Sequence, residues 1–160
     1  MLLGFPLIKK LSLQYRPFQA LLTAAASNVS SSPYFMRCYE RLCEEYTYAG
    51  NRSSILLGLM RVQANCGYIL GESKLSRSLL TADIFYIFVP QDIRGAGYGK
   101  RLVEAFEIES KERSSAVGVK TVAIRIIMKS CIRISHDFWI KNGFVGDKKS
   151  EVLLKMLKIS

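Results

Sequence analysis

Apolar residues downstream of position 53 gather into runs rich in Ile, Leu, Val, Phe and Tyr, with polar or glycine-rich segments between them. Runs of this length and composition predict β-strands, and they span 54–62, 66–70, 79–89, 120–128 and 152–159. The run at 79–89 shows no polar alternation after Asp83, which predicts a strand covered on both faces. Between the runs, Ala64 and Asn65 predict a hairpin turn, and the polar residues 71–78 predict a loop.

Two amphipathic segments in the same half of the chain predict helices. Residues 100–113 have the pattern of a helix that packs on a sheet, because its apolar residues fall on one side: Leu102, Val103 and Phe106. A short helix over 135–142 has Gly143 at the position of a helix stop. Phe144 then begins a short strand ahead of the last apolar run.

The upstream part of the chain predicts two further helices, over 18–26 and 34–46, while 1–16 fits either a first strand or a loose apolar arm. The resulting order is two helices, three strands, a helix, a strand, a helix and two strands. This order predicts an α/β fold, of the α+β type with a mixed sheet and helices on its faces. A length of 160 residues fits one domain, with a helical part over 1–50 and a core over 52–160.

A glycine-rich turn, with the sequence RGAGYG at 94–99, joins the apolar run at 79–89 to the helix predicted at 100–113. Its three glycines at alternate positions let the backbone turn sharply and leave the N–H groups uncovered by side chains. The helix that follows adds its unpaired first amides and the positive end of its dipole. The combination predicts a binding site for a phosphate or pyrophosphate group.

Three phosphate-binding motifs compete for this turn. A P-loop is excluded, because Arg94 stands where its first glycine is required and Arg101 stands where its Ser or Thr is required. The dinucleotide fingerprint G-x-G-x-x-G also fails, since the turn reads G-x-G-x-G. The pattern that does match is R/Q-x-x-G-x-G/A, and it resembles the acetyl-CoA loop of the Gcn5-related N-acetyltransferases (GNAT). An ordinary glycine-rich turn is the alternative on these six residues alone.

Three flanking segments are similar to the same family. Residues 136–144, HDFWIKNGF, resemble the fourth-helix motif, which ends in an aromatic pair, three residues, then Gly-Phe. Residues 67–71, GYILG, resemble the third strand, and residues 81–84, TADI, stand where histone-acetyltransferase members carry Ala-Glu-Ile. The resemblance extends from about residue 52 to the end of the chain, and 1–50 matches only as a pair of helices.

The resemblance implies that the protein binds acetyl-CoA. In the family, the amides of the loop surround the pyrophosphate, and the backbone of the preceding strand pairs with the pantetheine arm in a gap between the fourth and fifth strands. Carried onto this sequence, the implied cofactor-binding residues are Ile87, Phe88, Val89, Arg94, Gly95, Ala96, Gly97, Tyr98, Gly99 and Lys100.

The resemblance also implies a general base. Asp83 stands six residues before Val89, where the histone-acetyltransferase members have their catalytic Glu. An amine substrate is mostly protonated at neutral pH, so a group must accept its proton directly or through water. In an extended strand, residues 83, 85, 87 and 89 share one face, which places Asp83 roughly 20 Å from Val89 and predicts a bridging water. The alternative for Asp83 is a structural carboxylate at a strand start.

The chain departs from the family where many members have a Tyr that protonates the leaving thiolate, because Trp139 occupies that position. An indole is not an acid at neutral pH. Tyr86 is the candidate substitute, although a packed strand aromatic is the competing interpretation. Trp139 and His136 share a helix face, and both are expected to line the site or to serve as core and surface residues. The remaining alternatives are a thiolate that leaves unassisted and a degenerate, inactive member of the family.

Composition adds limits on compartment and partners. The net charge is +10, from 23 basic and 13 acidic residues, which suits an acidic partner such as nucleic acid, an acidic protein or a cofactor phosphate. The four cysteines form no CxxC pair and there is one histidine, so we expect no metal site and a reduced, cytoplasmic protein. No apolar run approaches the ~20 residues of a membrane span.

The resulting hypothesis is an N-acetyltransferase that uses acetyl-CoA. The acceptor is a primary amine on a protein, a peptide, a small metabolite or an aminoacyl-tRNA, and a homodimer is left open. The alternative is a catalytically degenerate module of the same fold that binds acyl-CoA or nucleic acid without turnover.

Overall fold

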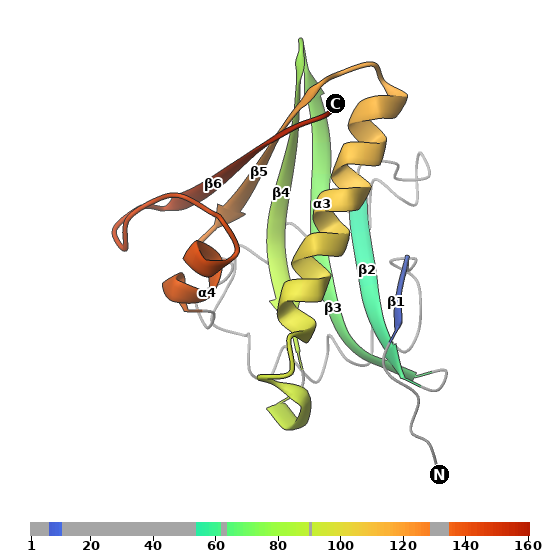
Figure 1. The fold of residues 1–160 in the computed structure, drawn as a ribbon, viewed down its shortest axis with the longest axis vertical. Helices are drawn as coiled ribbons and strands as arrows, with labels where there is room; N and C mark the ends of the chain where they lie inside the picture. The colour runs from blue at the N-terminus through green and yellow to red at the C-terminus, as the bar shows by residue number, and fades with distance from the viewer. Residues whose placement is uncertain (1–6, 11–53, 62–63, 90, 129–134) are drawn as a thin grey trace.

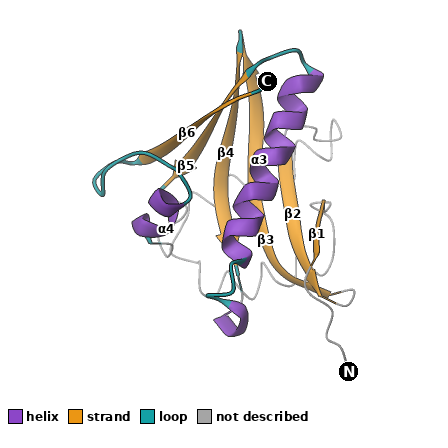
Figure 2. Cartoon of the chain, in the orientation of Figure 1, coloured by secondary structure: helices purple, strands orange, loops and turns teal. Residues whose placement is uncertain are grey.

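The computed structural model describes residues 7–10, 54–61, 64–89, 91–128 and 135–160 (Figure 1). The strands among them form one six-stranded sheet in the order of the chain. Their bounds are Leu7–Lys10 (β1), Ser54–Arg61 (β2), Ala64–Ser76 (β3), Leu79–Phe88 (β4), Thr121–Ile127 (β5) and Val152–Lys158 (β6). All neighbours are antiparallel except β4 and β5, which are parallel (Figure 2). The expected mixed α/β sheet is therefore confirmed.

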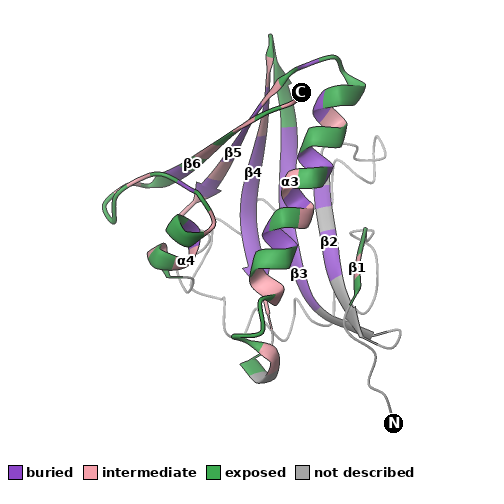
Figure 3. Ribbon diagram, in the orientation of Figure 1, coloured by how far each residue is buried: buried purple, intermediate pink, exposed green. Residues whose placement is uncertain are grey.

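The parallel pair of strands requires a crossover, and the helix Tyr98–Ala116 (α3) provides it. This helix lies across one face of the sheet and packs against β2, β3, β4 and β5. Its sheet-facing residues Leu102, Val103 and Phe106 are buried, whereas its outer side is exposed (Figure 3). Phe106 fits closely because position 71 is a glycine; a Cβ there would lie 2.8 Å from the Phe106 ring and would also collide with the Asp83 carbonyl oxygen.

A second, shorter helix, His136–Lys141 (α4), lies on the same face as α3. Lys155 of β6 joins the two helices to the sheet, because its Nζ donates to Glu107 Oε1 of α3 at 2.6 Å and to the Asn142 carbonyl oxygen at 2.8 Å. After α4, Val145 forms a short antiparallel bridge with Leu154 of β6. This bridge is the short strand that was expected to begin at Phe144.

Two expectations about the region between β2 and β4 are wrong. Ala64 and Asn65 do not form a turn; they pair with Arg61 and Met60 as the start of β3. Residues 71–76 are not a loop, because β3 continues through them and pairs with β4 as far as Ser76. The polar sequence was misleading because Glu72 and Ser73 are buried with partners: Glu72 pairs with Lys74 of the same strand, and Ser73 accepts a hydrogen bond from Arg113 of α3.

Upstream of β2, the structure describes only β1. Of the two alternatives for 1–16, a strand or a loose arm, the structure shows a strand at Leu7–Lys10. This strand pairs with β2 at the edge of the sheet. The helices expected over 18–26 and 34–46 lie outside the described residues. Within the described part of the chain, no helix is both long enough and apolar enough to cross a bilayer.

A bulge in β4 shifts the alternation of its side chains. Leu70 pairs with Tyr86, but the next β3 residue, Gly71, pairs with Ile84, so Phe85 is an additional residue in β4. Ala82 and Ile84 belong to the core under α3 before the bulge, and Ile87 belongs to it afterwards. The expectation that 83, 85, 87 and 89 share one face is therefore wrong, because a one-residue insertion moves every later side chain to the other face.

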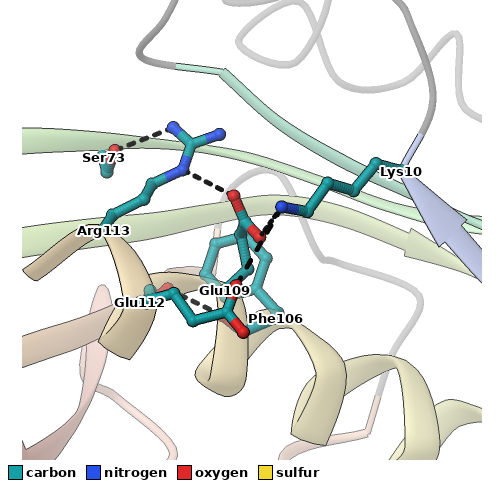
Figure 4. Close-up of polar contacts among 7 residues, drawn as sticks. Lys10, Ser73, Phe106, Glu109, Glu112 and Arg113 are labelled. Carbon is teal, nitrogen blue, oxygen red and sulfur yellow. Dashed lines mark hydrogen bonds and ion pairs between the residues drawn. The ribbon is translucent and has the colours of Figure 1, made fainter. Parts of the chain in front are cut away.

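A cluster of charged residues holds β1 against α3 (Figure 4). The buried carboxylate of Glu109 accepts from Lys10 Nζ at 2.7 Å and from Arg113 Nε at 2.9 Å, and Arg113 also donates to Ser73 Oγ at 3.1 Å. Burial alone would raise the pKa of Glu109, but the hydrogen bonds and charges of Lys10 and Arg113 bring it below its ordinary value of 4.5. The carboxylate is therefore charged in the folded protein at neutral pH.

We expect Glu109→Gln to lower the free energy of unfolding by about 1–3 kcal/mol at neutral pH, because it removes charge-assisted hydrogen bonds from a buried group. A depressed pKa stabilises the fold above the ordinary value of 4.5, and this contribution is lost as the pH falls below it. The difference in unfolding free energy between Glu109→Gln and wild type should therefore become smaller at acidic pH. Urea unfolding at a series of pH values measures it.

The matched control is Glu112→Gln, since Glu112 lies 4.0 Å from the same Lys10 nitrogen but is 65% exposed. An exposed pair of this kind contributes less than about 1 kcal/mol. Equal losses in both variants, or no loss for Glu109→Gln at neutral pH, would contradict the structural role given to Glu109.

Candidate functional site

The parallel strands β4 and β5 separate partway along their length. Their pairing begins at Leu80 with Val122 and ends at Ile84 with Ile126, although β4 continues to Phe88. The pairing ends next to Phe85, the bulged residue, where the ladder is disrupted. Figure 1 shows β5 and β6 diverging from β4 toward α4. The end of β4, followed by the glycine-rich turn, therefore lies beside separated strands.

The glycine-rich turn has the geometry of an open backbone nest. Gly95 and Gly97 have φ angles of 83° and 85°, in the left-handed region that glycine adopts without steric cost. A Cβ built at either position would have no heavy atom within 4 Å, so the backbone there is open on that side. Arg94 links the turn to the end of the preceding strand, because its Nε donates a hydrogen bond to the Val89 carbonyl oxygen at 2.7 Å.

The third glycine of the motif also has a packing role. A Cβ at Gly99 would lie 3.2 Å from the Phe138 ring and 3.9 Å from Val89 Cγ2. Gly99 therefore allows the first turn of α3 to pack closely on α4. The helix α4 is itself fixed by its caps: Ser135 Oγ accepts from the Phe138 amide at 3.2 Å, and Asn142 Nδ2 donates to the Phe138 carbonyl oxygen at 2.7 Å.

The first turn of α3 favours a negatively charged ligand. Its N-cap, Gly97, supplies no side-chain hydrogen bond, and no acidic residue lies in the first turn. Instead Lys100 and the neighbouring Arg101 are both exposed, and their charges oppose the helix dipole by about 0.3–1 kcal/mol each. Unpaired helix amides, an open turn and surplus positive charge together fit a phosphate or pyrophosphate group.

Tyr98 and Lys100, which the resemblance places in the cofactor site, lie at the edges of this turn. Lys100 Nζ lies 3.9 Å from Glu104 Oε1, and the Arg101 guanidinium lies 5.6 Å from the centre of the Tyr98 ring. Ala96 is exposed between the two open glycines, and Ile87 to Val89 lead into the turn from β4. The structure therefore brings the predicted cofactor residues into one contiguous region, and their binding role stays a prediction.

Asp83 lies on the sheet face away from α3, one position before β4 and β5 part. Its buried carboxylate accepts two hydrogen bonds from Arg125 of β5, at 2.6 Å from Nε and 2.7 Å from Nη2. On its other side, Asp83 pairs in register with Glu72 of β3, whose Oε1 lies 3.2 Å from Lys74 Nζ. A role for Asp83 as general base stays a prediction, and it requires an oxygen lone pair that Arg125 does not use.

Arg125 is the residue of this site that the sequence patterns did not single out, because it lies inside an apolar run. A signal was present: Asp83 is the one charge in the run 79–89, Arg125 is a charge of opposite sign in the middle of the run 120–128, and a crossover helix joins the two runs. Two such strands are parallel neighbours, so their lone charges are candidates for a pair.

The aromatic candidates are buried. Tyr86 is 6% exposed, and its ring centre lies 5.9 Å from that of Tyr68. Trp139 is fully buried and packs edge-on against Phe138 and Phe144 at ring distances of 4.9 Å and 5.5 Å. Its Nε1 has no hydrogen-bond partner among the described residues, which costs about 1–3 kcal/mol for a buried donor.

His136 lies half-buried at the start of α4, and its Nε2 lies 2.9 Å from the Gly146 carbonyl oxygen. Because a carbonyl only accepts, this nitrogen carries a proton and donates it. His136 thus holds the turn after Phe144 to α4, while Trp139 points into the core. Of the two residues expected to line the site, His136 has a visible structural partner and Trp139 has an unsatisfied donor.

No protein-family model and no curated protein matches the sequence. Solved structures do match in fold. One is an acetyltransferase of the GNAT family from Staphylococcus aureus Mu50, with a TM-score of 0.65 at 16% identity over 96% of this chain and 99% of that chain. Another is the ribosomal-protein-alanine N-acetyltransferase from Brucella melitensis biovar Abortus 2308, with a TM-score of 0.63 at 19% identity over 92% and 96%.

A third match is the PaiA N-acetyltransferase from Thermoplasma acidophilum, solved in complex with coenzyme A. Its TM-score is 0.59 at 18% identity, and the match covers 98% of this chain and 100% of that chain. Sequence identities this low support a shared fold and do not identify the acceptor substrate. The separated parallel strands, the crossover helix and these matches agree: this chain has the fold of the GNAT-family acetyltransferases.

Proposed function

We propose that this protein is an N-acetyltransferase that transfers the acetyl group of acetyl-CoA to a primary amine. The observation that carries the proposal is the open turn at Gly95 and Gly97, which leads into the uncapped first turn of α3 beside two separated strands. Bound there, acetyl-CoA would supply an activated acyl group as a thioester. The turn, Lys100 and Arg101 would hold its phosphates.

The protein must also handle the proton of the amine, which is mostly charged at neutral pH. Asp83 is the carboxylate next to the point where the strands separate, so it is the proposed acceptor of that proton. Its bidentate contact with Arg125 fixes its orientation and engages both carboxylate oxygens. A bridging water, or partial release of Asp83 from Arg125, would then allow the amine proton to reach the carboxylate.

The acceptor is proposed to be an amine on an acidic carrier. The net charge of +10 favours negatively charged partners through long-range attraction, so an amine on an acidic protein or on RNA suits this chain better than a polyamine does. Weaker turnover at raised salt is the expected signature, because salt screens attraction between exposed charges.

A second candidate function is acyl-CoA binding without turnover. Two observations favour it: both oxygens of Asp83 accept from Arg125, and Trp139, whose indole is not an acid, stands where the family resemblance implies a phenol. An enzyme and a binding module make the same prediction for the loop and different predictions for catalysis.

Thiol release from acetyl-CoA separates the two candidates. The assay is run with a panel of amines that contains small amines, peptides with free amino termini, acidic proteins and aminoacyl-tRNA. We expect release that depends on one class of amine and an acetylated product that mass spectrometry identifies. Saturable binding of acetyl-CoA with no amine-dependent release across the panel would instead support the binding module.

A further inference from the structure

The indole of Trp139 is a polar group whose role the fold alone does not explain. Trp139 is the only tryptophan of the chain, it has no exposed surface, and its Nε1 has no hydrogen-bond partner among the described residues. Nearly all buried donors in native proteins are paired, so an unpaired one needs a specific reason. A ligand that brings an acceptor is one such reason.

An internal water does not provide that acceptor. A buried water needs two to four polar partners, and an apolar site stays dry. The described surroundings of Trp139 are aromatic and aliphatic: the Phe138 and Phe144 rings lie against the indole, and all three belong to or pack on the hydrophobic core. The acceptor is therefore expected to come from a molecule large enough to bury apolar surface as well.

The position of the indole relates it to the glycine-rich turn. Phe138 contacts the indole on one side and approaches Gly99, the last glycine of the turn, on the other. Phe144 also packs on the indole, and its amide donates to the Trp139 carbonyl oxygen at 3.1 Å. Of the two rings, Phe138 is half-buried and Phe144 is buried, and Phe138 is the one that contacts both the indole and the Gly99 position of the turn.

The chemistry of the site selects a neutral acceptor. A phosphate is too costly to place in an enclosed apolar site without a paired charge, and the turn and Lys100 lie outside it. The pantetheine arm of coenzyme A is neutral and carries carbonyl oxygens and a sulfur along a largely apolar chain. Such a group can accept one hydrogen bond and bury apolar surface at the same time.

We propose that the indole N–H of Trp139 is the hydrogen-bond donor that holds the neutral pantetheine arm of a bound acyl-CoA, with Phe138 moving aside to admit it. This inference rests on the proposed function, because it takes acyl-CoA as the ligand of the turn. Trp139 is then a residue that distinguishes acyl-CoA from a bare nucleotide. It contributes through a hydrogen bond and supplies no proton.

A proton–nitrogen correlation spectrum tests the proposal directly, because a single tryptophan gives a single indole cross-peak. The protein is titrated with coenzyme A and, separately, with adenosine 3′,5′-bisphosphate, which has phosphates and no arm. We expect the indole proton to move downfield with coenzyme A and to stay in place with the nucleotide. Backbone peaks of the glycine-rich turn should move with both ligands.

The outcomes are distinguishable. Movement of the turn peaks with coenzyme A while the indole peak stays in place would overturn this inference and leave the proposed function intact. Equal movement of the indole with both ligands would also overturn it, because the arm would not be the cause. No movement of any peak with coenzyme A would remove the proposed function and this inference together.

The variant Trp139→Phe provides a second measurement, since it keeps an aromatic ring and removes the donor. We expect coenzyme A to bind roughly 3–10-fold more weakly, as for the loss of one hydrogen bond, and the nucleotide to bind as it does to wild type. Affinity lost equally for both ligands would show a structural effect on the turn and contradict the proposal. A melting curve confirms that the variant is folded.

Discussion

Replacing Gly97 with glutamate should weaken acetyl-CoA binding by roughly 10²–10³-fold, because it puts a negative charge within about 4 Å of the position proposed for the pyrophosphate. Gly97 has a φ of 85°, and a Cβ placed there would have no heavy atom within 4 Å, so the new side chain would project into the open turn and displace no neighbour. Calorimetric titration of the variant with acetyl-CoA measures the loss.

The matched control is Gly118→Glu, beyond the opposite end of α3. Gly118 has a φ of 74° and equally open surroundings, so the substitution adds the same backbone strain and the same charge away from the turn. Its affinity for acetyl-CoA should equal that of wild type. If Gly97→Glu also bound acetyl-CoA as wild type does, the turn would not be the pyrophosphate site.

Replacing Asp83 with asparagine should slow acetyl transfer by ~10²–10⁴-fold at neutral pH, the range typical of a lost general base. The defect should shrink as the pH approaches the pKa of the amine, about 10.4 for a lysine and about 8 for an α-amino group, because the amine then arrives neutral. Rates measured across about pH 6–9 test this dependence. A rate equal to that of wild type across this range would remove Asp83 from the mechanism.

Arg125→Gln separates catalysis from structure, because it breaks the same contact and keeps the carboxylate. Both variants should be less stable than wild type, since each removes one partner of a partly buried pair whose carboxylate is buried. Only Asp83→Asn should show the pH-dependent loss of rate. Equal, pH-independent losses in the two variants would show that the pair is structural and that another group accepts the proton.

The parts of the site that were predictable from the sequence are local along the chain. A buried strand, three alternating glycines and an amphipathic helix follow one another within 79–116, and each has a signature in composition or periodicity. The structure places β4, the open turn and α3 in that order, and the left-handed φ angles of Gly95 and Gly97 account for two of the glycines.

The parts that were not predictable depend on contacts between distant segments. The bulge at Phe85 has no glycine or other local marker, yet it sets which side chains of β4 face the core and where β5 separates. The polar end of β3 looks like a loop until its partners in β4 are known. The pair of Asp83 with Arg125 joins residues on different strands, so neither apolar run indicates it alone.

Gly99 illustrates the same limit within the motif itself. The sequence presents it as a third phosphate-loop glycine, and the structure adds that it leaves room for the Phe138 ring. That contact depends on α4, which begins at His136. This helix follows β5 in the sequence and packs on α3, which precedes β5. A pattern of glycines therefore predicts the turn, and only the tertiary structure assigns a task to each of them.

A crystal structure of the protein with acetyl-CoA tests the central claim most directly. The account predicts that the pyrophosphate oxygens accept hydrogen bonds from backbone amides of residues 95–99, and that the pantetheine arm follows β4 beyond Ile84, where β5 has separated. A pyrophosphate bound away from the turn, with the amides of Gly95 and Gly97 facing solvent, would contradict it.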